Sequence, residues 1–280
     1  MLLIKLVTPA EAGKFIHREL RAAERIGFSG KAALAQVVRP GNIAASFSGS
    51  MPTAIAISGA AEVRSANLAD LIGIKRVAIP AGEFIYQGQK IEGNGFKIAE
   101  TEFTNGQFRQ LLALRPTELS QIVANPQERL KGSMGIAADQ NAADDCPMVY
   151  LSQVESEGIA RLLGLRLLTD QEWERAAAGT NGRMYSFGED FDESKVTFND
   201  QGTRSVYAHR DAATSEGVLD LSGNVWEWTS SNYTQESNTR VLRGGSWSNG
   251  YPGCLRASDR GNFHPESRHS TVGVRFAEDL

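Results

Sequence analysis

The feature that most constrains this chain is its C-terminal tract from Arg240 to Phe276, in which two kinds of residue alternate. One kind forms a framework of arginines, glycines and their neighbours: Arg243, Gly244, Gly245, Ser246, Trp247, Arg256, Ala257, Arg260, Pro265, Arg268, Gly273 and Arg275. The other forms short runs rich in Gly, Ser and Asn, with neither a helical nor a period-two apolar pattern. Long structured loops usually carry function. We therefore predict a functional, loop-rich ending rather than an irregular terminus, since residues 272–276 read as a final strand.

Size and charge narrow the class of protein. The 280 residues can form one large domain or two smaller ones, and 41% hydrophobic with 22% charged residues is ordinary for a soluble globular protein. The net charge of -4 disfavours non-specific binding to nucleic acid. No apolar run approaches the ~20 residues that cross a bilayer, and the apolar start at residues 1–9 is short and interrupted by Lys5. We expect no signal peptide and no membrane span, and hence a cytoplasmic or virion-associated protein.

Cysteine usage indicates neither a disulfide scaffold nor a zinc site. The two cysteines, Cys146 and Cys254, are too few for the first and too far apart for the second. Two buried free thiols are the favoured interpretation, and a bridge between them stays open.

The first 75 residues read as a small N-terminal region of unknown role. Residues 2–7 have strand character, and Thr8-Pro9-Ala10-Glu11 combines three signals for the start of a helix. Residues 28–70 are rich in Ala, Ser and Gly with weak periodicity. We therefore place a domain boundary between residues 75 and 76.

From residue 76 onward the sequence predicts short strands and three capped helices. Residues 76–86 and 96–99 have strand character. Each helix begins with a capping box, in which a hydroxyl and a Gln or Glu side chain satisfy free amides of the first turn: Thr104-Asn105-Gly106-Gln107, Ser152-Gln153-Val154-Glu155 and Thr169-Asp170-Gln171-Glu172. Pro116 is expected to end the first helix and residues 117–147 to be irregular. No long helix is expected after Gly179.

Six segments together resemble the formylglycine-generating enzyme family, also called the sulfatase-modifying factor family. They are VAIPAGEF at 77–84, EFTNGQF at 102–108, LRLLTDQEWERAA at 165–177, GVLDLSGNVWEWT at 217–229, RGGSW at 243–247 and GVRF at 273–276. The resemblance implies an α+β, C-type lectin-like fold with a twisted mixed sheet, two or more helices and much irregular structure. We assign residues 76–280 to this domain, with residues 240–276 as a candidate display tract.

The resemblance also exposes a departure from the oxidases of this family, which hold copper with two cysteines after the GGS motif. The later position matches Cys254, but the earlier one is Asn249. An amide is a poor ligand for Cu(I), which prefers thiolates, and one thiolate alone leaves the metal under-coordinated. We therefore expect no enzyme.

Iron oxidases of the same superfamily use a histidine-rich site on an added helical domain. The four histidines of this chain are His17, His209, His264 and His269. They assemble no facial triad, and His17 reads as a surface residue of the N-terminal helix.

The final tract resembles more closely the variable proteins of diversity-generating retroelements, in which this fold ends in a display surface. Diversified codons in those proteins cannot encode Lys, Met, Gln, Glu or Trp. Between Ser248 and Val272 there is no Lys, Met, Gln or Trp, and Glu266 is the one exception. The spacing of the framework arginines also resembles the invariant scaffold of those proteins.

The candidate ligand-binding residues lie between the framework positions of the tract. They are Asn249, Tyr251, Ser258, Asp259, Asn262, Phe263, His264, Ser267, His269 and Ser270. Tyr, Ser and Asn are typical of antibody loops, where they combine rigid contact area with adaptable hydrogen bonds. We predict that Arg256, Arg260 and Arg268 hold the tract from below. Packing beneath the loops is the alternative for Tyr251, Phe263 and His264.

A calcium site is a further expectation from the family resemblance. Asp220 and Glu227 supply carboxylate oxygens, and Gly223 and Val225 supply carbonyls, which suits Ca2+. A turn held by hydrogen bonds alone is the alternative. No cofactor is required for binding.

The leading hypothesis is a receptor- or adhesin-type variable protein that binds a protein or cell-surface ligand through the C-terminal tract, with an oligomer allowed. A metal-dependent oxidase of the superfamily and an inactive structural homologue are the alternatives.

Overall fold

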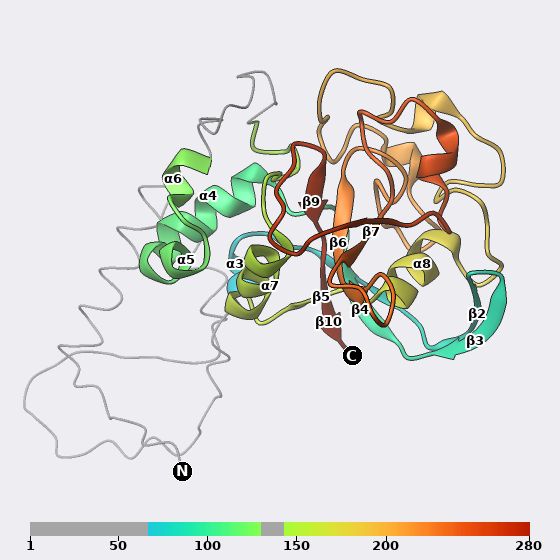
Figure 1. Cartoon of the computed structure of the whole chain (residues 1–280), viewed down its shortest axis with the longest axis horizontal. Helices are drawn as coiled ribbons and strands as arrows, with labels where there is room; N and C mark the ends of the chain where they lie inside the picture. The colour runs from blue at the N-terminus through green and yellow to red at the C-terminus, as the bar shows by residue number, and fades with distance from the viewer. Residues whose placement is uncertain (1–66, 130–142) are drawn as a thin grey trace, which may run out of the picture. The chain divides into compact units, whose positions relative to one another are not determined.

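A four-stranded sheet joins the first and last strands of the domain (Figure 1). The computed structural model describes residues 67–129 and 143–280. In it the strands lie in the order β1 (Arg76–Ile79), β4 (Phe96–Ala99), β10 (Phe276–Asp279) and β5 (Arg166–Leu167). All three pairings are antiparallel, and Ile98 lies opposite both Val77 and Ala277. The last strand is therefore enclosed by segments from much earlier in the chain.

A second four-stranded sheet is built largely from the C-terminal tract. Its order is β8 (Gly261–Phe263), β7 (Arg240–Arg243), β6 (Trp226–Asn232) and β9 (Val272–Val274). The β6–β9 pairing is parallel, and the other two are antiparallel. A separate hairpin pairs β2 (Gly82–Tyr86) with β3 (Gln89–Gly93). The tract thus contributes three short strands, and irregular segments connect them.

The three helices with capping boxes are confirmed. They are α4 (Asn105–Leu114), α7 (Gln153–Leu162) and α8 (Asp170–Ala178), and in each both hydrogen bonds of the box are present. Phe108, Ile159 and Trp173 on their inner faces are fully buried. A cap and an apolar face are local signals, so the sequence alone was sufficient to predict these helices.

The first helix ends at Leu114, before Pro116, as expected, but the expectation of an irregular segment after Pro116 was wrong. Pro116 begins a helix, α5 (Pro116–Ile122), because a proline at the first helical position has no amide to leave unpaired. The short helix α6 (Pro126–Arg129) follows, so residues 117–129 are not irregular.

The compact unit begins at Asn67, ahead of the boundary placed at residues 75–76. The short helix α3 (Leu68–Leu71) and the residues after it put Ala69 and Ile72 into the larger hydrophobic core. Their apolar side chains explain why the unit includes them. The strand and helix expected before residue 27 lie outside the described residues.

Three apolar clusters support the fold. The largest cluster contains Phe108 and Trp228, and the second contains Phe96 and Trp173. A small third cluster contains Tyr185 and Leu255. After Gly179 the described chain contains only short 3-10 helices: η1 (Glu193–Lys195), η2 (Arg210–Ala212) and η3 (Pro252–Leu255). The absence of a long helix there was expected.

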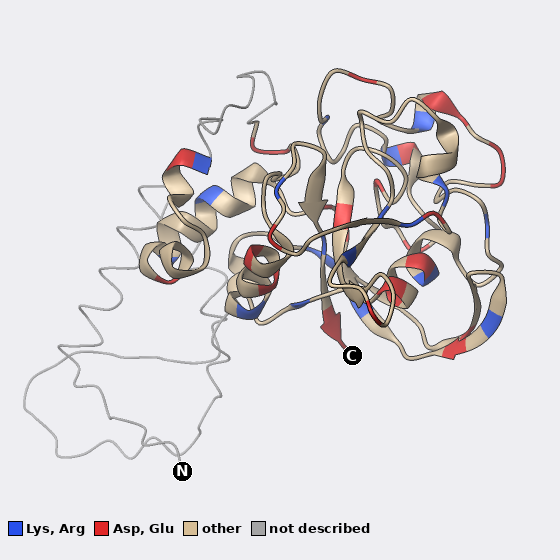
Figure 2. Cartoon of the chain, in the orientation of Figure 1, with Lys and Arg blue, Asp and Glu red and all other residues tan. Residues whose placement is uncertain are grey.

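Charged residues are interspersed. Figure 2 shows acidic and basic positions mixed over the view rather than gathered on one basic face. Within residues 67–129 and 143–280, no helix combines the length and the apolar composition that a membrane crossing requires.

Candidate functional site

Arg243, at the end of β7, ties the C-terminal tract to α8. Its guanidinium is fully buried and pairs with Asp170 and Glu174 of that helix. Its Nη1 also donates to the carbonyls of Ala257 (2.8 Å) and Asp259 (2.7 Å). A planar guanidinium holds several acceptors in fixed directions. One side chain therefore fixes the turn after η3 against a rigid helix.

Arg275, between β9 and β10, is a second fully buried arginine. It donates to both oxygens of Glu227 on β6, at 2.8–3.1 Å. It also donates to the carbonyls of Ala99, Glu100 and Leu219, at 2.7–3.0 Å. The end of the tract is thereby fastened to both four-stranded sheets.

Two further buried carboxylates lie near Arg275 without a full set of partners. Glu102 Oε2 and Asp220 Oδ2 have no hydrogen-bond partner in the described part of the chain. Burial, and then the neighbouring Asp220, raises the pKa of Glu102 well above its ordinary range. Burial raises the pKa of Asp220 to about 7, against the lowering effect of Arg275. Because burial disfavours the charged form, Glu102 and Asp220 retain protons at pH values where exposed carboxyls are ionised.

These contacts bear on the expected Ca2+ ligands. Both oxygens of Glu227 accept from Arg275, and Glu227 Oε2 also accepts from Trp173 Nε1 at 2.7 Å. A cation at Glu227 would compete for those lone pairs and would lie close to the guanidinium. The Gly223 amide donates to the Gly244 carbonyl at 2.8 Å, as in a turn held by hydrogen bonds. Calcium here stays a prediction, and the arrangement of Glu227 does not fit it.

Two glycines let the tract turn directly after Arg243. Gly244 and Gly245 have φ values of 95° and 75°, a region that favours glycine. A Cβ atom on Gly245 would lie 2.4 Å from Leu255 Cδ2 and 2.8 Å from the carbonyl oxygen of Cys254. The GGS segment can therefore turn back onto η3 only if this residue has no side chain.

Asn249, which the family resemblance places at the first copper thiolate, helps to hold this turn. Its Oδ1 accepts from the backbone N–H of Ser246 at 2.8 Å and from the Ser246 hydroxyl at 3.0 Å. Its carbonyl accepts from the amide of Asn199 at 3.0 Å. The side-chain oxygen is thus engaged within the protein, which leaves the amide nitrogen for contact with a ligand.

Both cysteines are free thiols, Cys146 buried and Cys254 half-buried. Burial raises the pKa of both, to about 11 for Cys146, and the carboxylate of Asp259 raises that of Cys254 further. The thiolate is the form that attacks electrophiles and binds metals. In the metal-free protein both cysteines are therefore held as thiols at neutral pH.

None of the ten candidate ligand-binding residues is buried. Four are exposed: Tyr251, Ser258, Asn262 and His264. Six are half-buried: Asn249, Asp259, Phe263, Ser267, His269 and Ser270. All ten are therefore accessible to some degree, whereas Arg243 and Arg275, near the two ends of the tract, are fully buried.

Two candidate aromatic residues stack on each other. The rings of Phe263 on β8 and His269 lie 4.1 Å apart between centroids, with an interplanar angle of 19°. Phe263 also packs against the larger core cluster. Packing beneath the loops therefore applies in part to Phe263. Tyr251 is 65% exposed and His264 is exposed, so it does not apply to them.

The three arginines predicted to hold the tract have different outcomes. Arg260 pairs with Asp170 at 2.8 Å and donates to a backbone carbonyl, and Arg268 Nε donates to Glu155 on α7 at 2.9 Å. The prediction is wrong for Arg256, which is exposed and whose guanidinium has no hydrogen bond or ion pair within the described residues. The neighbouring Ala257 takes the buried position at this turn.

Glu155 is a residue whose role sequence reasoning underestimated. Its carboxylate is buried and accepts from the amide of Ser152 (2.8 Å), as a helix cap, and from Arg268. Its other oxygen accepts from Arg129 of α6 at 3.3 Å. The capping box was the only signal in the sequence, because partners this distant leave no local pattern.

The histidines assemble no metal centre in the described chain. No group of three or more His, Cys, Asp or Glu side chains there could hold a metal ion. The ring of His209 lies 3.1 Å from both Thr197 Oγ1 and the Ser194 carbonyl oxygen, a structural arrangement. His17 lies outside the described residues.

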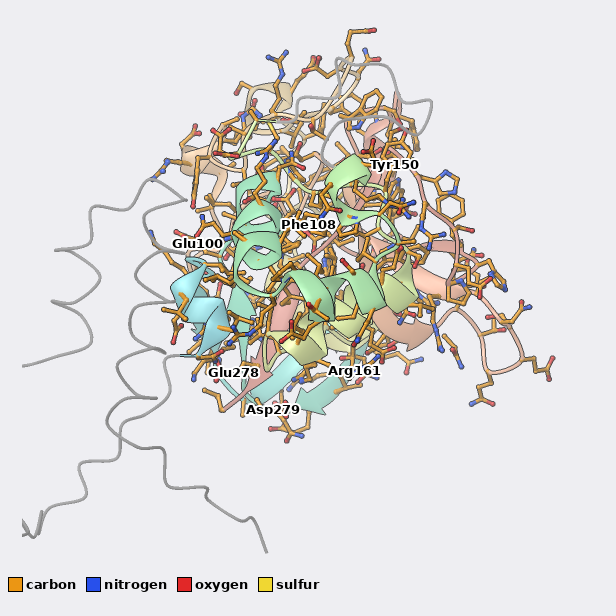
Figure 3. All side chains as sticks on the ribbon, turned by 90° about the vertical axis from the view of Figure 1, so that its left-hand side faces the viewer. Glu100, Phe108, Tyr150, Arg161, Glu278 and Asp279 are labelled. Carbon is orange, nitrogen blue, oxygen red and sulfur yellow. The ribbon has the colours of Figure 1, made fainter. Side chains whose placement is uncertain are left out.

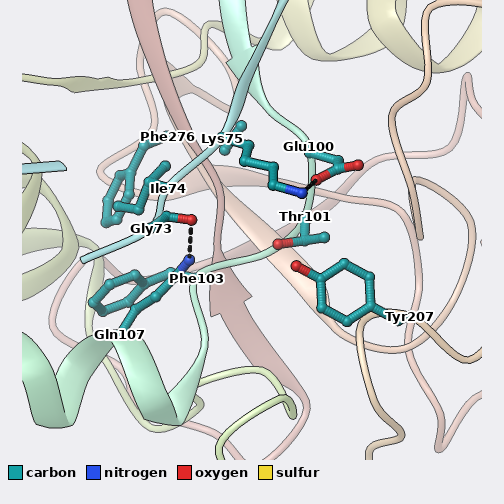
Figure 4. A pocket seen from close by; sticks show the side chains of 10 residues that line it. Gly73, Ile74, Lys75, Glu100, Thr101, Phe103, Gln107, Tyr207 and Phe276 are labelled. Atoms are coloured by element: carbon teal, nitrogen blue, oxygen red, sulfur yellow. Dashed lines mark hydrogen bonds and ion pairs between the residues drawn. The ribbon is translucent and has the colours of Figure 1, made fainter. Parts of the chain in front are cut away.

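A small polar pocket lies away from the candidate residues, and of the tract only its last residue, Phe276, lines it (Figure 4). Its lining includes Tyr207 together with Lys75 and Glu100, whose charged atoms lie 3.8 Å apart. None of the ten candidate residues lines it.

Comparison with known proteins decides the family. The sulfatase-modifying factor enzyme 1-like domain family matches residues 67–280. The chain belongs to this family. The resemblance inferred from the six motifs is therefore confirmed.

Relatives within the family differ in activity. The chain is 34% identical to the hercynine oxygenase of Mycobacterium tuberculosis over 162 residues, 49% of this chain and 37% of that protein. It is 31% identical to the inactive C-alpha-formylglycine-generating enzyme 2 of Bos taurus over 150 residues, 47% of this chain and 50% of that protein. The chain thus spans half or less of the length of these two relatives.

A solved structure shows the same fold. Variable protein 1 of Treponema denticola superimposes with a TM-score of 0.54 and 18% identity, over 74% of this chain and 95% of that one. At this identity the likeness concerns the fold alone. The expected α+β, C-type lectin-like fold is confirmed.

Proposed function

We propose that this protein is a non-catalytic ligand-binding protein that presents residues 249–270 to a protein or cell-surface ligand. One observation carries the proposal. The side chains that hold the tract, Arg243 and Arg275, are fully buried, whereas none of the ten candidate residues is buried. A backbone fixed from below leaves the accessible side chains free to differ, since exposed substitutions usually cost little stability.

Two features of the same site support a non-catalytic role. The family resemblance places Asn249 at the position of the first copper thiolate, and the Asn249 side-chain oxygen accepts two hydrogen bonds from Ser246. The Cys254 thiol has a raised pKa. A relative named as inactive shows that membership of the family does not require activity.

We infer further that the tract is of the diversified kind found in variable proteins of diversity-generating retroelements. The residue types between Ser248 and Val272 and the spacing of the arginines support this inference. A template repeat in the adjoining DNA would support it directly. A genome without such a repeat would leave the binding proposal in place and remove the diversification.

A four-residue substitution tests the binding proposal. Tyr251, Ser258, Asn262 and His264 are changed together to Ala, and the matched control changes Lys90, Glu92, Gln127 and Arg161, which are exposed residues outside the tract. Both variants are melted and screened against a random-peptide library. We expect both to fold and only the first to lose the peptides that the wild type selects. If the first variant unfolds, or keeps the same peptides, the proposal fails.

The oxidase remains the second candidate because of family membership and the retained Cys254. We expect no formylglycine formation on a cysteine-containing sulfatase peptide with added copper. Asn249→Cys restores the second thiol and should increase the copper retained per chain, although it removes two hydrogen bonds to Ser246. Turnover by the wild type would contradict the non-catalytic proposal.

A further inference from the structure

Tyr150, just before α7, has a left-handed backbone conformation with φ of 59°. Among the described residues, the other non-glycine residues with positive φ are a glutamine, an aspartate and three asparagines: Gln87, Asn125, Asn199, Asp220 and Asn224. Asn and Asp tolerate this region, whereas a bulky residue there is a true outlier. Such outliers persist when surrounding contacts enforce them, and they gather at functional sites.

Core packing does not explain the conformation. Tyr150 is only half-buried, whereas the next residues, Leu151 and Ser152, are almost completely buried. Tyr150 as a residue is therefore partly accessible to solvent, or to a ligand.

The backbone of Tyr150 is held from two sides. Its N–H donates to the carbonyl of His269 in the C-terminal tract at 3.1 Å. Its carbonyl accepts from Arg129 Nη1 at 3.1 Å. Arg129 pairs in turn with Glu155, which also holds Arg268 of the tract. The conformation of Tyr150 and that of the loop at residues 264–270 are thus fixed by one set of contacts.

A second apolar residue borders the same loop. Val154 on α7 is 50% exposed, and its N–H lies 3.4 Å from the Pro265 carbonyl oxygen. Figure 3 labels Tyr150 in the upper half of the view. Tyr150 and Val154 therefore flank a loop that carries His264, Ser267, His269 and Ser270.

We propose that Tyr150, with Val154 beside it, is a fixed anchor of the ligand-binding surface, and that the ligand is a protein that places an aliphatic or aromatic side chain against the Tyr150 ring. This inference rests on the proposed function and adds residues outside the tract. Tyrosine supplies rigid amphipathic contact area at low cost in side-chain entropy and is enriched among the residues that dominate binding energy. Because hydrogen bonds to His269 and Arg129 already fix the backbone of Tyr150, binding has less backbone ordering to do.

The test uses substitutions that separate strain from contact. Tyr150→Gly removes the ring and suits a positive φ, so it should keep or raise the melting temperature. Tyr150→Phe keeps the ring. Asn125→Gly is the matched control, because Asn125 has φ of 50° and is exposed between α5 and α6.

The probe is a set of dodecapeptides selected from a random phage library on the full chain and then synthesised. We expect Tyr150→Gly to weaken their binding by about tenfold or more, the size typical of a truncated anchor. Tyr150→Phe and Asn125→Gly should bind as the wild type does. Isothermal titration calorimetry and thermal melting measure the two effects on the same samples.

Four outcomes would overturn the inference. Wild-type affinity in Tyr150→Gly removes the anchor, and if the four-residue variant of the tract still loses the peptides, the proposed function stands. A lower melting temperature in Tyr150→Gly would make the ring a packing residue. Two outcomes would overturn the anchor and the proposed function together. One is that the peptides bind equally well to Tyr150→Gly and to the four-residue variant of the tract, and the other is that no peptide is selected at all.

Discussion

The two fully buried arginines, Arg243 and Arg275, hold the same tract but differ in the balance of charge around them. Arg243 faces two carboxylates, Asp170 and Glu174, and Asp170 also pairs with Arg260 at 2.8 Å. Arg275 faces three carboxylates, and no second cation pairs with them among the described residues. The first centre is balanced in charge, whereas the second has an excess of carboxylates.

This difference in charge balance affects the hydrogen bonding and the pKa values of the carboxyl groups at the two centres. At the Arg275 centre, Glu102 and Asp220 each keep an oxygen without a partner, and burial raises the pKa of both. At the Arg243 centre, Tyr86 donates to Asp170 at 2.8 Å and the Gln87 amide donates to Glu174 at 2.7 Å. The beginning of the tract is therefore held by ion pairs, and its end is held by a centre that also depends on protons.

The largest effect should come from breaking the balanced centre. Arg243→Met leaves Asp170 and Glu174 buried without their cation, and we expect a loss of about 3–5 kcal/mol in the free energy of unfolding. Arg243→Lys keeps the positive charge but not the several donors of the planar guanidinium. It should therefore lose less free energy of unfolding than the Met variant and give a folded sample for comparison. Urea denaturation measures both. A loss below about 1 kcal/mol for the Met variant would mean that the ion pairs do not hold the tract.

The Arg275 centre should instead respond to pH. In the unfolded chain Asp220 and Glu102 release their protons near pH 4, whereas in the folded chain Asp220 titrates at about 7. Between these values the folded state holds protons that the unfolded state has lost. The stability contributed by these groups is therefore present below about pH 4 and declines as pH rises toward 7, by at most about 1.4 kcal/mol per pH unit for each group.

Two isosteric variants isolate this contribution from the other carboxylates of the protein. Asp220→Asn keeps the shape and tolerates the positive φ of 54° at this position, and Glu102→Gln does the same for the second acid. Unfolding free energies from pH 4 to pH 8 should fall less steeply in both variants than in the wild type. Parallel curves would show that neither acid carries an excess proton in the folded state.

Sequence reasoning predicted the parts of this fold that depend on neighbours in the chain. The capping boxes at Thr104, Ser152 and Thr169 each depend on residues three apart, and all three were correct. Pro116 ends the first helix as predicted, but the helix that it begins was missed, because a proline suits both the end of one helix and the first position of the next.

The candidate site depended on distant contacts and was predicted less well. The tract and its ten accessible side chains were predicted from residue types and spacing, but the partners of its arginines were not. Arg256 and Arg268 look alike in sequence, yet only Arg268 reaches a partner, Glu155, on another helix. The φ of Tyr150 has no signature in the sequence, because it is imposed by hydrogen bonds to His269 and Arg129.

Arg256 and Arg268 allow the same comparison near the surface of the protein. Here we expect a smaller change in the free energy of unfolding. Arg268→Ala removes one donor from the buried Glu155, which keeps Arg129 and its cap, so we expect a loss of about 1 kcal/mol. Arg256→Ala should stay within about 0.5 kcal/mol, because the side chain is exposed. Equal losses in urea denaturation would show that position in the tract, rather than the contact to Glu155, determines the cost.

The smallest effect is expected from removing calcium, and it tests how the Arg275 centre is neutralised. If Ca2+ occupied the segment from Asp220 to Glu227, chelation would lower the melting temperature, because a ligand bound only to the folded state stabilises it. The carboxylate of Glu227 is already bonded to Arg275 and Trp173, so we expect no shift when EDTA is added to protein purified with calcium. Asp220→Asn serves as the control, because it removes a carboxylate that a cation would need but keeps the contacts of Arg275 to Glu227. A melting temperature that falls with EDTA in the wild type and not in Asp220→Asn would mean that a cation, rather than protons, balances the excess carboxylates.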